Sequence, residues 1–341
     1  MQRTAALAIA CALLAAGCAD DDQEIRATPQ AAPTPGDAAS PAGTVAVLPT
    51  RLPVSASPTA AGNRVQARLD LTVGPDWLAV GAGSLWVRTD SGIVYRIDPT
   101  TNTVAARIPI ADGSTENLCQ GLAADDTAVW SCAPDGDIVR IDPRTNTVVA
   151  TIGVGKSTDQ GPIPVAFGHV WVLTGDGSHL VGIAGDAADE TVDLGARCSN
   201  VSATATSLWL ACLADDQVVR VDPTSGRVTT RLTGFDTPRL VSGSGGTVWV
   251  SFLGGLAQID EATAAVRTVT AVFVGPQAGL FADADGVWVR DQGLFLARVD
   301  TAGHVVDEMS VPEQSGGSVL EAFGSLWATA YDDEVLYRLR L

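Results

Sequence analysis

Tryptophan recurs along most of this chain at a spacing close to 40 residues. Seven of the eight tryptophans stand 38 to 44 residues apart, at Trp86, Trp130, Trp171, Trp209, Trp249, Trp288 and Trp327. A tight turn precedes each one, as in GAGSLW and AFGHVW. Five of the units continue into a strand-like run that ends in an acidic turn, as in RIDPTTNTV. A fixed period of about 20–50 residues indicates supersecondary units that bury their apolar faces only by packing on one another.

The clearest unit, residues 78–110, reads as four short strands at 78–80, 84–88, 93–97 and 104–110. Each is rich in β-branched or aromatic residues and is bounded by Gly, Pro, Asn or Asp, which is the pattern of strands joined by hairpin turns. One such sheet leaves two edges and an apolar face uncovered. Seven copies therefore predict an all-β fold, a seven-bladed β-propeller with four-stranded blades, over residues 63–341.

The two ends of this repeat region supply complementary parts of one blade. The seventh copy stops after its third strand, at residues 334–341. Residues 64–71 match the fourth strand at 103–110, with apolar residues at the same places. We therefore predict that the N-terminal strand completes the C-terminal blade and closes the ring, which removes the open edges.

The N-terminal 62 residues have a different composition. Residues 1–17 carry Arg3 and an apolar run that is shorter than the roughly 20 residues needed to cross a bilayer, as in a signal peptide. Residues 14–18, LAAGC, resemble a bacterial lipobox, which implies lipidation of Cys18. Residues 18–62 are rich in Pro and Ala and lack large apolar groups, so we expect a disordered tether. We expect an exported protein anchored to the outer face of the bacterial cytoplasmic membrane, or a secreted one if Cys18 is not lipidated.

Four further cysteines lie in two pairs, each centred on the first hairpin turn of a blade. Cys119 precedes Trp130 and Cys132 follows it, and Cys198 and Cys212 flank Trp209 in the same way. Antiparallel strands folded about these turns place the members of each pair opposite one another. We predict two disulfides, Cys119–Cys132 and Cys198–Cys212, which export makes favourable. A metal site built from all four thiolates would require two distant blades to converge, and we do not expect it.

In a propeller, the start of the first strand and the end of the second strand of every blade lie on one face, around the mouth of the central channel. Four arginines, two amides and two aromatics map to this face, which we call the funnel. They are Trp77, Arg88, Asn117, Arg197, Arg239, Gln277, Arg290 and Tyr331. The guanidinium group of arginine forms paired hydrogen bonds with carboxylate or phosphate. An anionic or sugar-like ligand therefore fits such a funnel. The alternative is that these are solvated loop residues paired with neighbouring aspartates.

The net charge and the lack of catalytic and nucleotide motifs argue against several other functions. A net charge of −18 argues against nucleic acid and against a basic patch on anionic lipid, so the lipid anchor is the one membrane contact that we expect. The three histidines fall at different topological positions, and no nucleophile, phosphate-loop or nucleotide motif is present. We therefore expect no catalytic centre, no metal and no cofactor. The expected partner is an unidentified small molecule, glycan or protein at the funnel of a monomer.

The repeats of this chain resemble those of two known families. RIDPTTNTVAARIPI resembles the repeat of YVTN-type β-propeller proteins, and LAVGAGSLWV resembles the repeat of streptogramin (virginiamycin B) lyase-like propellers. The lyase resemblance implies a seven-bladed ring with His and Glu on the funnel face and a magnesium ion, whereas this chain offers no His there. We therefore favour a lipid-anchored, extracytoplasmic propeller for binding or scaffolding. The alternative is a streptogramin-lyase-like or hydrolase-like enzyme with its site in the funnel.

Overall fold

A computed structural model describes residues 44–45, 59–60, 63–72, 74–110, 119–133, 135–159, 161–269, 279–291, 294–311 and 316–341. The chain divides into two compact units, Met1–Ser40 and Pro41–Leu341. The described residues all belong to the second unit. The signal segment, Cys18 and most of the predicted tether lie outside the described residues.

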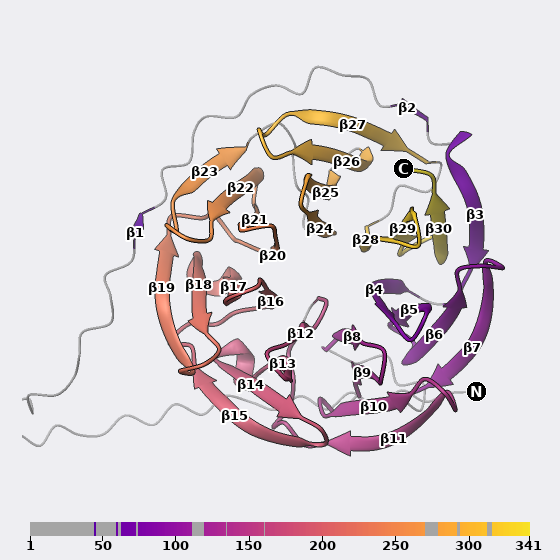
Figure 1. The fold of residues 1–341 in the computed structure, drawn as a ribbon, viewed down its shortest axis with the longest axis horizontal. Coiled ribbons are helices and arrows are strands. Elements are labelled where there is room, and N and C mark those ends of the chain that lie inside the picture. Colours follow the sequence, from indigo (N-terminus) through magenta and orange to yellow (C-terminus); the bar gives the residue numbers. More distant parts are fainter. Residues whose placement is uncertain are drawn as a thin grey trace, which may run out of the picture. The chain divides into compact units, whose positions relative to one another are not determined.

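The second unit is a ring of seven antiparallel sheets, as the repeat predicts (Figure 1). Blade I contains β4 (Pro75–Gly81), β5 (Ser84–Thr89), β6 (Ile93–Asp98) and β7 (Thr103–Pro109). Blade II contains β8 (Leu122–Ala124), β9 (Val129–Cys132), β10 (Ile138–Asp142) and β11 (Thr147–Ile152). Blade III contains β12 (Val165–Ala166), β13 (His169–Thr174), β14 (His179–Ala184) and β15 (Ala187–Asp193). Blade IV contains β16 (Asn200–Ala203), β17 (Leu208–Cys212), β18 (Gln217–Asp222) and β19 (Arg227–Thr233).

The remaining blades follow the same order from the channel outward. Blade V contains β20 (Leu240–Ser244), β21 (Thr247–Phe252), β22 (Gly255–Asp260) and β23 (Val266–Val269). Blade VI contains β24 (Leu280–Asp283), β25 (Gly286–Asp291), β26 (Leu294–Asp300) and β27 (Val305–Ser310). Blade VII contains β28 (Val319–Ala322), β29 (Ser325–Ala330) and β30 (Val335–Leu339), with β3 (Val65–Asp70) as its outer strand. Short 3-10 turns occur at η2 (Gly175–Gly177) and η3 (Leu213–Asp215).

The closure of the ring through the N-terminal strand is confirmed. Strand β3 pairs antiparallel with β30, from Val65 opposite Leu339 to Asp70 opposite Val335. Within the range predicted as a tether, β1 (Thr44–Val45) and β2 (Thr59–Ala60) pair in parallel with the outer strands β19 and β27. Figure 1 shows both at the rim of the ring.

Each repeated tryptophan is buried by the next blade. Trp327 of blade VII packs with Leu78, Leu85 and Val87 of blade I, and Trp209 of blade IV packs with Val241 of blade V. Both indoles are fully buried. A buried Trp is worth about 3–5 kcal/mol relative to Ala, so the interfaces between blades carry much of the stability.

An arginine on the third strand ties neighbouring blades together. Arg96 stacks 5.3 Å from the centre of the Trp86 ring, and its Nη1 donates to the Asn146 side chain of blade II at 3.1 Å. At the closure of the ring, Arg338 lies over Trp327 and donates to Asn102 Oδ1 of blade I at 2.8 Å. The Asn side chains of the turns in blades I and II thus each accept a hydrogen bond from an arginine of the preceding blade.

Replacing Arg338 with Gln should lower the free energy of unfolding by about 1–3 kcal/mol. The change leaves the acceptors of blade I unpaired and removes the stacking on Trp327. Urea unfolding of R338Q against R340Q measures this, because Arg340 has an exposed side chain. Equal stability of the two variants would contradict the proposed role of Arg338 in closing the ring.

Candidate functional site

The residue two positions after each repeated tryptophan is the last or the next-to-last residue of the second strand, at the funnel face and next to the following blade. In blade order these residues are Arg88, Cys132, Leu173, Ala211, Ser251, Arg290 and Thr329. Blades VI, VII and I are neighbours, so Arg290, Thr329 and Arg88 occupy equivalent places in consecutive blades. This brings two guanidinium groups to one part of the funnel.

Arg88, on β5, is the most unusual of these side chains. It is 1% exposed, and Nε, Nη1 and Nη2 are all buried without a hydrogen-bond partner among the described residues. Burial lowers its pKa to about 10, against the opposing effect of Asp90 and Asp76. Arg88 is therefore still charged at neutral pH. A buried cation whose donors are unpaired is costly, which makes this side chain the main candidate for a ligand contact.

Arg290, on β25, has fewer free donors. It is 3% exposed, its Nη1 donates to the Thr329 carbonyl at 3.1 Å, and its guanidinium lies 4.1 Å from the centre of the Phe295 ring. Nη2 is buried without a partner in the described part of the chain. Burial lowers the pKa of Arg290 to about 9, although Asp76 favours the charged form.

Asp76, on the innermost strand β4, interacts electrostatically with both arginines. Burial raises its pKa to about 7, Asp90 adds to the rise, and Arg290 and Arg88 oppose it. The pairing of β4 with β5 shifts register between Pro75 and Leu78, so an irregularity of the strand lies at this residue. Such irregularities redirect side chains and are common next to functional sites.

Asp90, in the turn after β5, is bound on both oxygens. Tyr331 Oη donates to Oδ2, and Gln120 Nε2 donates to Oδ1 at 2.7 Å. Trp77 Nε1 in turn donates to Gln120 Oε1 at 3.3 Å. Burial and the hydrogen bond to Asp90 raise the pKa of Tyr331. We call Asp76, Arg88, Asp90 and Arg290 the charge cluster, which residues of blades I, II, VI and VII surround.

The other predicted funnel residues do not join this cluster. The side chain of Arg197 is 54% exposed and lies 3.6 Å from Asp215, so the alternative of a solvated loop arginine fits this residue. Arg239 is half-buried before β20, and burial lowers its pKa. Asn117 and Gln277 lie outside the described residues. Trp77, Arg88, Arg290 and Tyr331 are thus brought together. Asp90, Gln120 and Thr329 were not predicted, although Thr329 stands at the position equivalent to Arg88.

A cavity of about 310 Å³ lies along the channel beside Trp77. Its wall comes from the inner strands or the segments before them, and it includes Trp77, Ile163, Val201, Val241, Phe281 and Val319. Asn200 Oδ1 accepts from Val241 N at 2.8 Å, and the Ser242 hydroxyl accepts from Ala282 N at 2.9 Å. These polar side chains therefore hold adjacent inner strands together.

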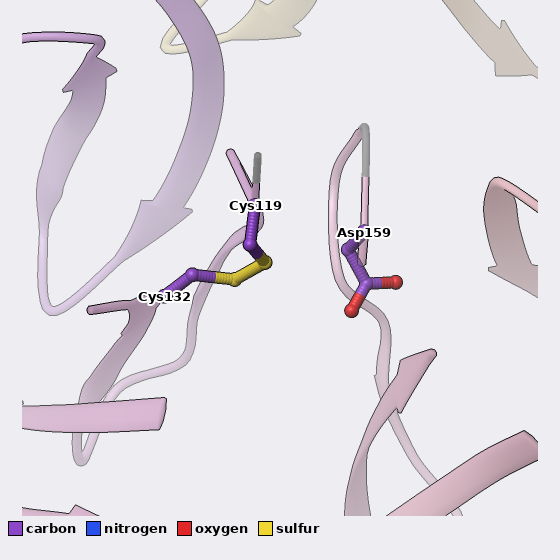
Figure 2. Close-up of side chains that lie close together, drawn as sticks. All are labelled: Cys119, Cys132 and Asp159. Carbon is purple, nitrogen blue, oxygen red and sulfur yellow. A yellow bond between two sulfur atoms is a disulfide. The ribbon is translucent and has the colours of Figure 1, made fainter. Parts of the chain in front are cut away.

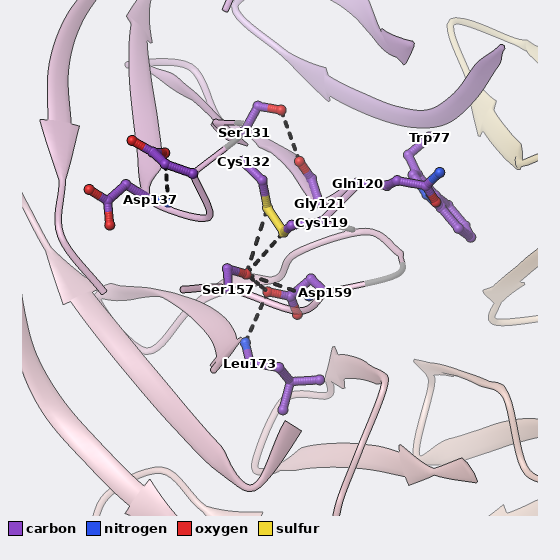
Figure 3. Close-up of a disulfide and its surroundings, with 11 residues drawn as sticks. Trp77, Cys119, Gln120, Gly121, Ser131, Cys132, Asp137, Ser157, Asp159 and Leu173 are labelled. Carbon is purple, nitrogen blue, oxygen red and sulfur yellow. Dashed lines mark hydrogen bonds between the residues drawn. A yellow bond between two sulfur atoms is a disulfide. The ribbon is translucent and has the colours of Figure 1, made fainter. Parts of the chain in front are cut away.

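Both predicted disulfides, Cys119–Cys132 and Cys198–Cys212, are present and confirm the spacing argument. They indicate an oxidising, extracytoplasmic environment. The first one fixes the segment that carries Gln120, and so helps to place a residue that binds Asp90. Figure 3 shows this disulfide beside Ser157, and shows Gln120, the residue after Cys119, beside Trp77.

Asp159 lies beside the Cys119–Cys132 disulfide (Figure 2) and was not predicted. It is 1% exposed, and its Oδ2 accepts from Ser157 Oγ at 2.8 Å and from Leu173 N at 2.9 Å. Oδ1 is buried without a partner in the described part of the chain. Burial raises the pKa of Asp159 to about 7.

Among the described residues, Cys119, Cys132 and Asp159 are the one group with metal-ligand spacing. The two sulfur atoms are bonded to each other, so they are not thiolate ligands, and the group is better described as a disulfide beside a buried acid. His169 and His304 each lie near an aspartate of their own, Asp189 at 3.2 Å and Asp300 at 3.4 Å.

Comparison with solved structures shows the same fold in proteins of different function. Virginiamycin B lyase from Staphylococcus aureus matches 81% of this chain and 98% of its own, at TM-score 0.65 and 15% identity. A hydrazine synthase chain from Kuenenia stuttgartiensis matches 81% and 97% at TM-score 0.67 and 13% identity. BamB from Moraxella catarrhalis matches 81% and 99% at TM-score 0.55 and 14% identity.

No family model and no curated protein matches the sequence. Among the residues that the structure describes, no helix has the length and apolar character to cross a membrane. The comparisons establish that this chain is a seven-bladed propeller of the kind seen in streptogramin lyases, and at this identity they establish the fold alone.

Replacing Asp159 with Asn should stabilise the protein increasingly as the pH rises. The pKa of Asp159 in the folded protein, about 7, lies above the usual value near 4, so between these pH values the folded protein binds more protons than the unfolded chain. The free energy of unfolding of the wild type therefore falls as the pH rises from about 4 to about 7. The gain of D159N over wild type should grow from about pH 4 to pH 8, by up to about 4 kcal/mol.

Urea unfolding at several pH values measures this difference. D176N is the matched control, because Asp176 is exposed in a turn of blade III. A D159N gain that does not change with pH would mean that Asp159 ionises as an ordinary surface acid.

Proposed function

We propose that this protein is an extracytoplasmic binding propeller whose ligand carries an oxyanion, a carboxylate or a phosphate, that pairs with Arg88. The single observation that supports this most strongly is the buried guanidinium of Arg88, whose three nitrogens have no partner among the described residues. Arg290 contributes a second unpaired donor in an equivalent position.

The chemistry of the two side chains favours an oxyanion over a neutral sugar. A guanidinium presents parallel N–H donors that match two oxygens of one carboxylate or phosphate. In buried surroundings a charge-assisted contact of this kind is stronger than in water, since solvent competes less. Binding would thus satisfy donors that the folded chain leaves unpaired.

The tether and lipid anchor complete this proposal. Signal cleavage before Cys18 and lipidation of that residue would hold the propeller near the membrane, with residues 18–62 as a spacer. The disulfides support export, because they form and persist in oxidising compartments.

An acid–base enzyme is the second candidate. Asp76 has a pKa near neutrality beside two arginines, which suits proton transfer, and the lyases named above share the fold. Hydrolysis or elimination of a cyclic ester such as a B-type streptogramin by purified protein, sensitive to a chelator, would favour this candidate over a binding protein.

Replacing Arg88 with Met should abolish oxyanion binding. The affinity for acetate or inorganic phosphate, measured by calorimetry at low salt near pH 6, should fall about 30-fold or more. Some loss of stability is also expected, because Met removes a charge that compensates Asp76 and Asp90, so urea unfolding of R88M should show that the variant is folded.

R197M is the matched control and should bind like wild type, since Arg197 is exposed and pairs with Asp215. The acetate and phosphate titrations distinguish a carboxylate ligand from a phosphate. Equal loss of binding in R88M and R197M would show a general charge effect and contradict the assigned site.

Replacing Cys18 with Ala should move the protein from the membrane fraction to the soluble fraction. A myristoyl-sized chain alone binds membranes weakly, whereas a lipoprotein anchor carries several chains and holds firmly. Fractionation with detection of the protein by antibody measures this. Membrane association that persists in a C18A protein whose signal segment has been cleaved would exclude the lipid anchor.

A further inference from the structure

The charge cluster contains as many carboxylates as guanidinium groups. Asp76 is on β4, Arg88 on β5, Asp90 in the turn that follows β5, and Arg290 on β25 of blade VI. Asp76 responds electrostatically to the other three. Tyr331, after β29, responds to Asp90, Asp76 and Asp332, and it is a hydrogen-bond donor to Asp90. With both aspartates ionised, the two positive and two negative charges compensate each other.

An incoming oxyanion disturbs this balance. It would add a negative charge to surroundings in which Arg88 and Arg290 are nearly fully buried. An excess charge in such surroundings is costly, and the usual response is a change of protonation. One bound proton would restore the balance.

The structure indicates which carboxylate takes the proton. Asp90 accepts hydrogen bonds on both oxygens, from Tyr331 and Gln120, so neither oxygen can take a proton without losing one of these bonds.

The backbone carbonyl of Asp76 accepts a hydrogen bond from Thr329 Oγ1 at 3.0 Å, and the Thr329 carbonyl accepts one from Arg290, so Asp76 lies at the contact between blades I and VII next to the arginines. Among the described residues, no hydrogen bond to the carboxylate of Asp76 occurs, and burial raises its pKa. Asp76 is therefore the carboxylate that protonates at the lowest cost.

We propose that the charge cluster binds its oxyanion together with one proton, which Asp76 takes up. This inference rests on the proposed function, because it concerns the same ligand at Arg88. The ligand pairs with the guanidinium of Arg88 while Asp76, neutralised, no longer repels it. Binding is thus favoured at acidic pH, and a rise in pH releases the ligand.

The coupling has a defined pH dependence. If only the protein with neutral Asp76 binds, the affinity falls up to about tenfold per pH unit above the pKa of free Asp76, near 7, and levels off below about pH 6. Without coupling, the affinity is nearly constant up to about pH 8, since the pKa values of Arg290 and Arg88, about 9 and about 10, lie above this pH.

Calorimetric titration of the mature protein with acetate and with sulfate tests this, since neither probe changes its own protonation above about pH 6. Repeating each titration in buffers of different ionisation enthalpy gives the number of protons taken up. We expect about one proton per bound anion at pH 8 for wild type. D76N should take up none, and its affinity should not depend on pH.

D332N is the matched control, because Asp332 is an exposed carboxylate on the same face. It should keep the proton uptake of wild type. The wild-type measurement stands without any variant, so a folding defect in D76N would not prevent the test.

Binding that depends on Arg88 but takes up no proton, or proton uptake that persists in D76N, would overturn this inference and leave the proposed function standing. No Arg88-dependent binding of either probe between about pH 5 and pH 9 would overturn both. Proton uptake that disappears in D76N and persists in D332N would establish the coupling.

Discussion

The packing of each tryptophan face against the next blade is the constraint on which this structure depends. A four-stranded blade buries its edges and apolar face only with two neighbours, so the chain needs a ring with no first or last member. The C-terminal blade lacks an outer strand of its own, and β3 supplies it. Trp327 then packs against blade I, and Arg338 reaches Asn102 across the same seam.

This scaffold determines where charged side chains can meet. The ends of the second strands point to one face in every blade, and most of them carry small or apolar residues that fit between blades. Arg88 and Arg290 break this rule at two positions separated by a single blade, where Thr329 accepts a hydrogen bond from Arg290. Gln120 of blade II and Tyr331 of blade VII then hydrogen-bond the two oxygens of Asp90, and Trp77 in turn donates to Gln120. The site is therefore formed by residues that differ from the repeat, and the repeat itself determines only where those residues are placed.

The repeat made the fold predictable from sequence, because its period, its Trp and its turn residues are local signals that recur seven times. The disulfides were predictable because the hairpin turn between each pair fixes their distance. The site was predictable only in part. Arg197 and Arg88 look alike in sequence, but one precedes a first strand and is solvated, and the other ends a second strand between two blades. Gln120, Asp90 and Asp159 act through contacts with other blades, and no spacing along the chain reveals those contacts. The sequence around these three residues does not indicate that their side chains are buried.

The account centres on a buried guanidinium whose hydrogen-bond donors lack partners among the described residues, so a crystal structure of the protein purified from its native source would test it most directly. Electron density at the guanidinium of Arg88 should show a carboxylate or phosphate group within about 3 Å of its nitrogens, beside Asp76. An Arg88 whose three nitrogens are all paired with groups of the protein itself would contradict the account, because no donor would then be left for a ligand.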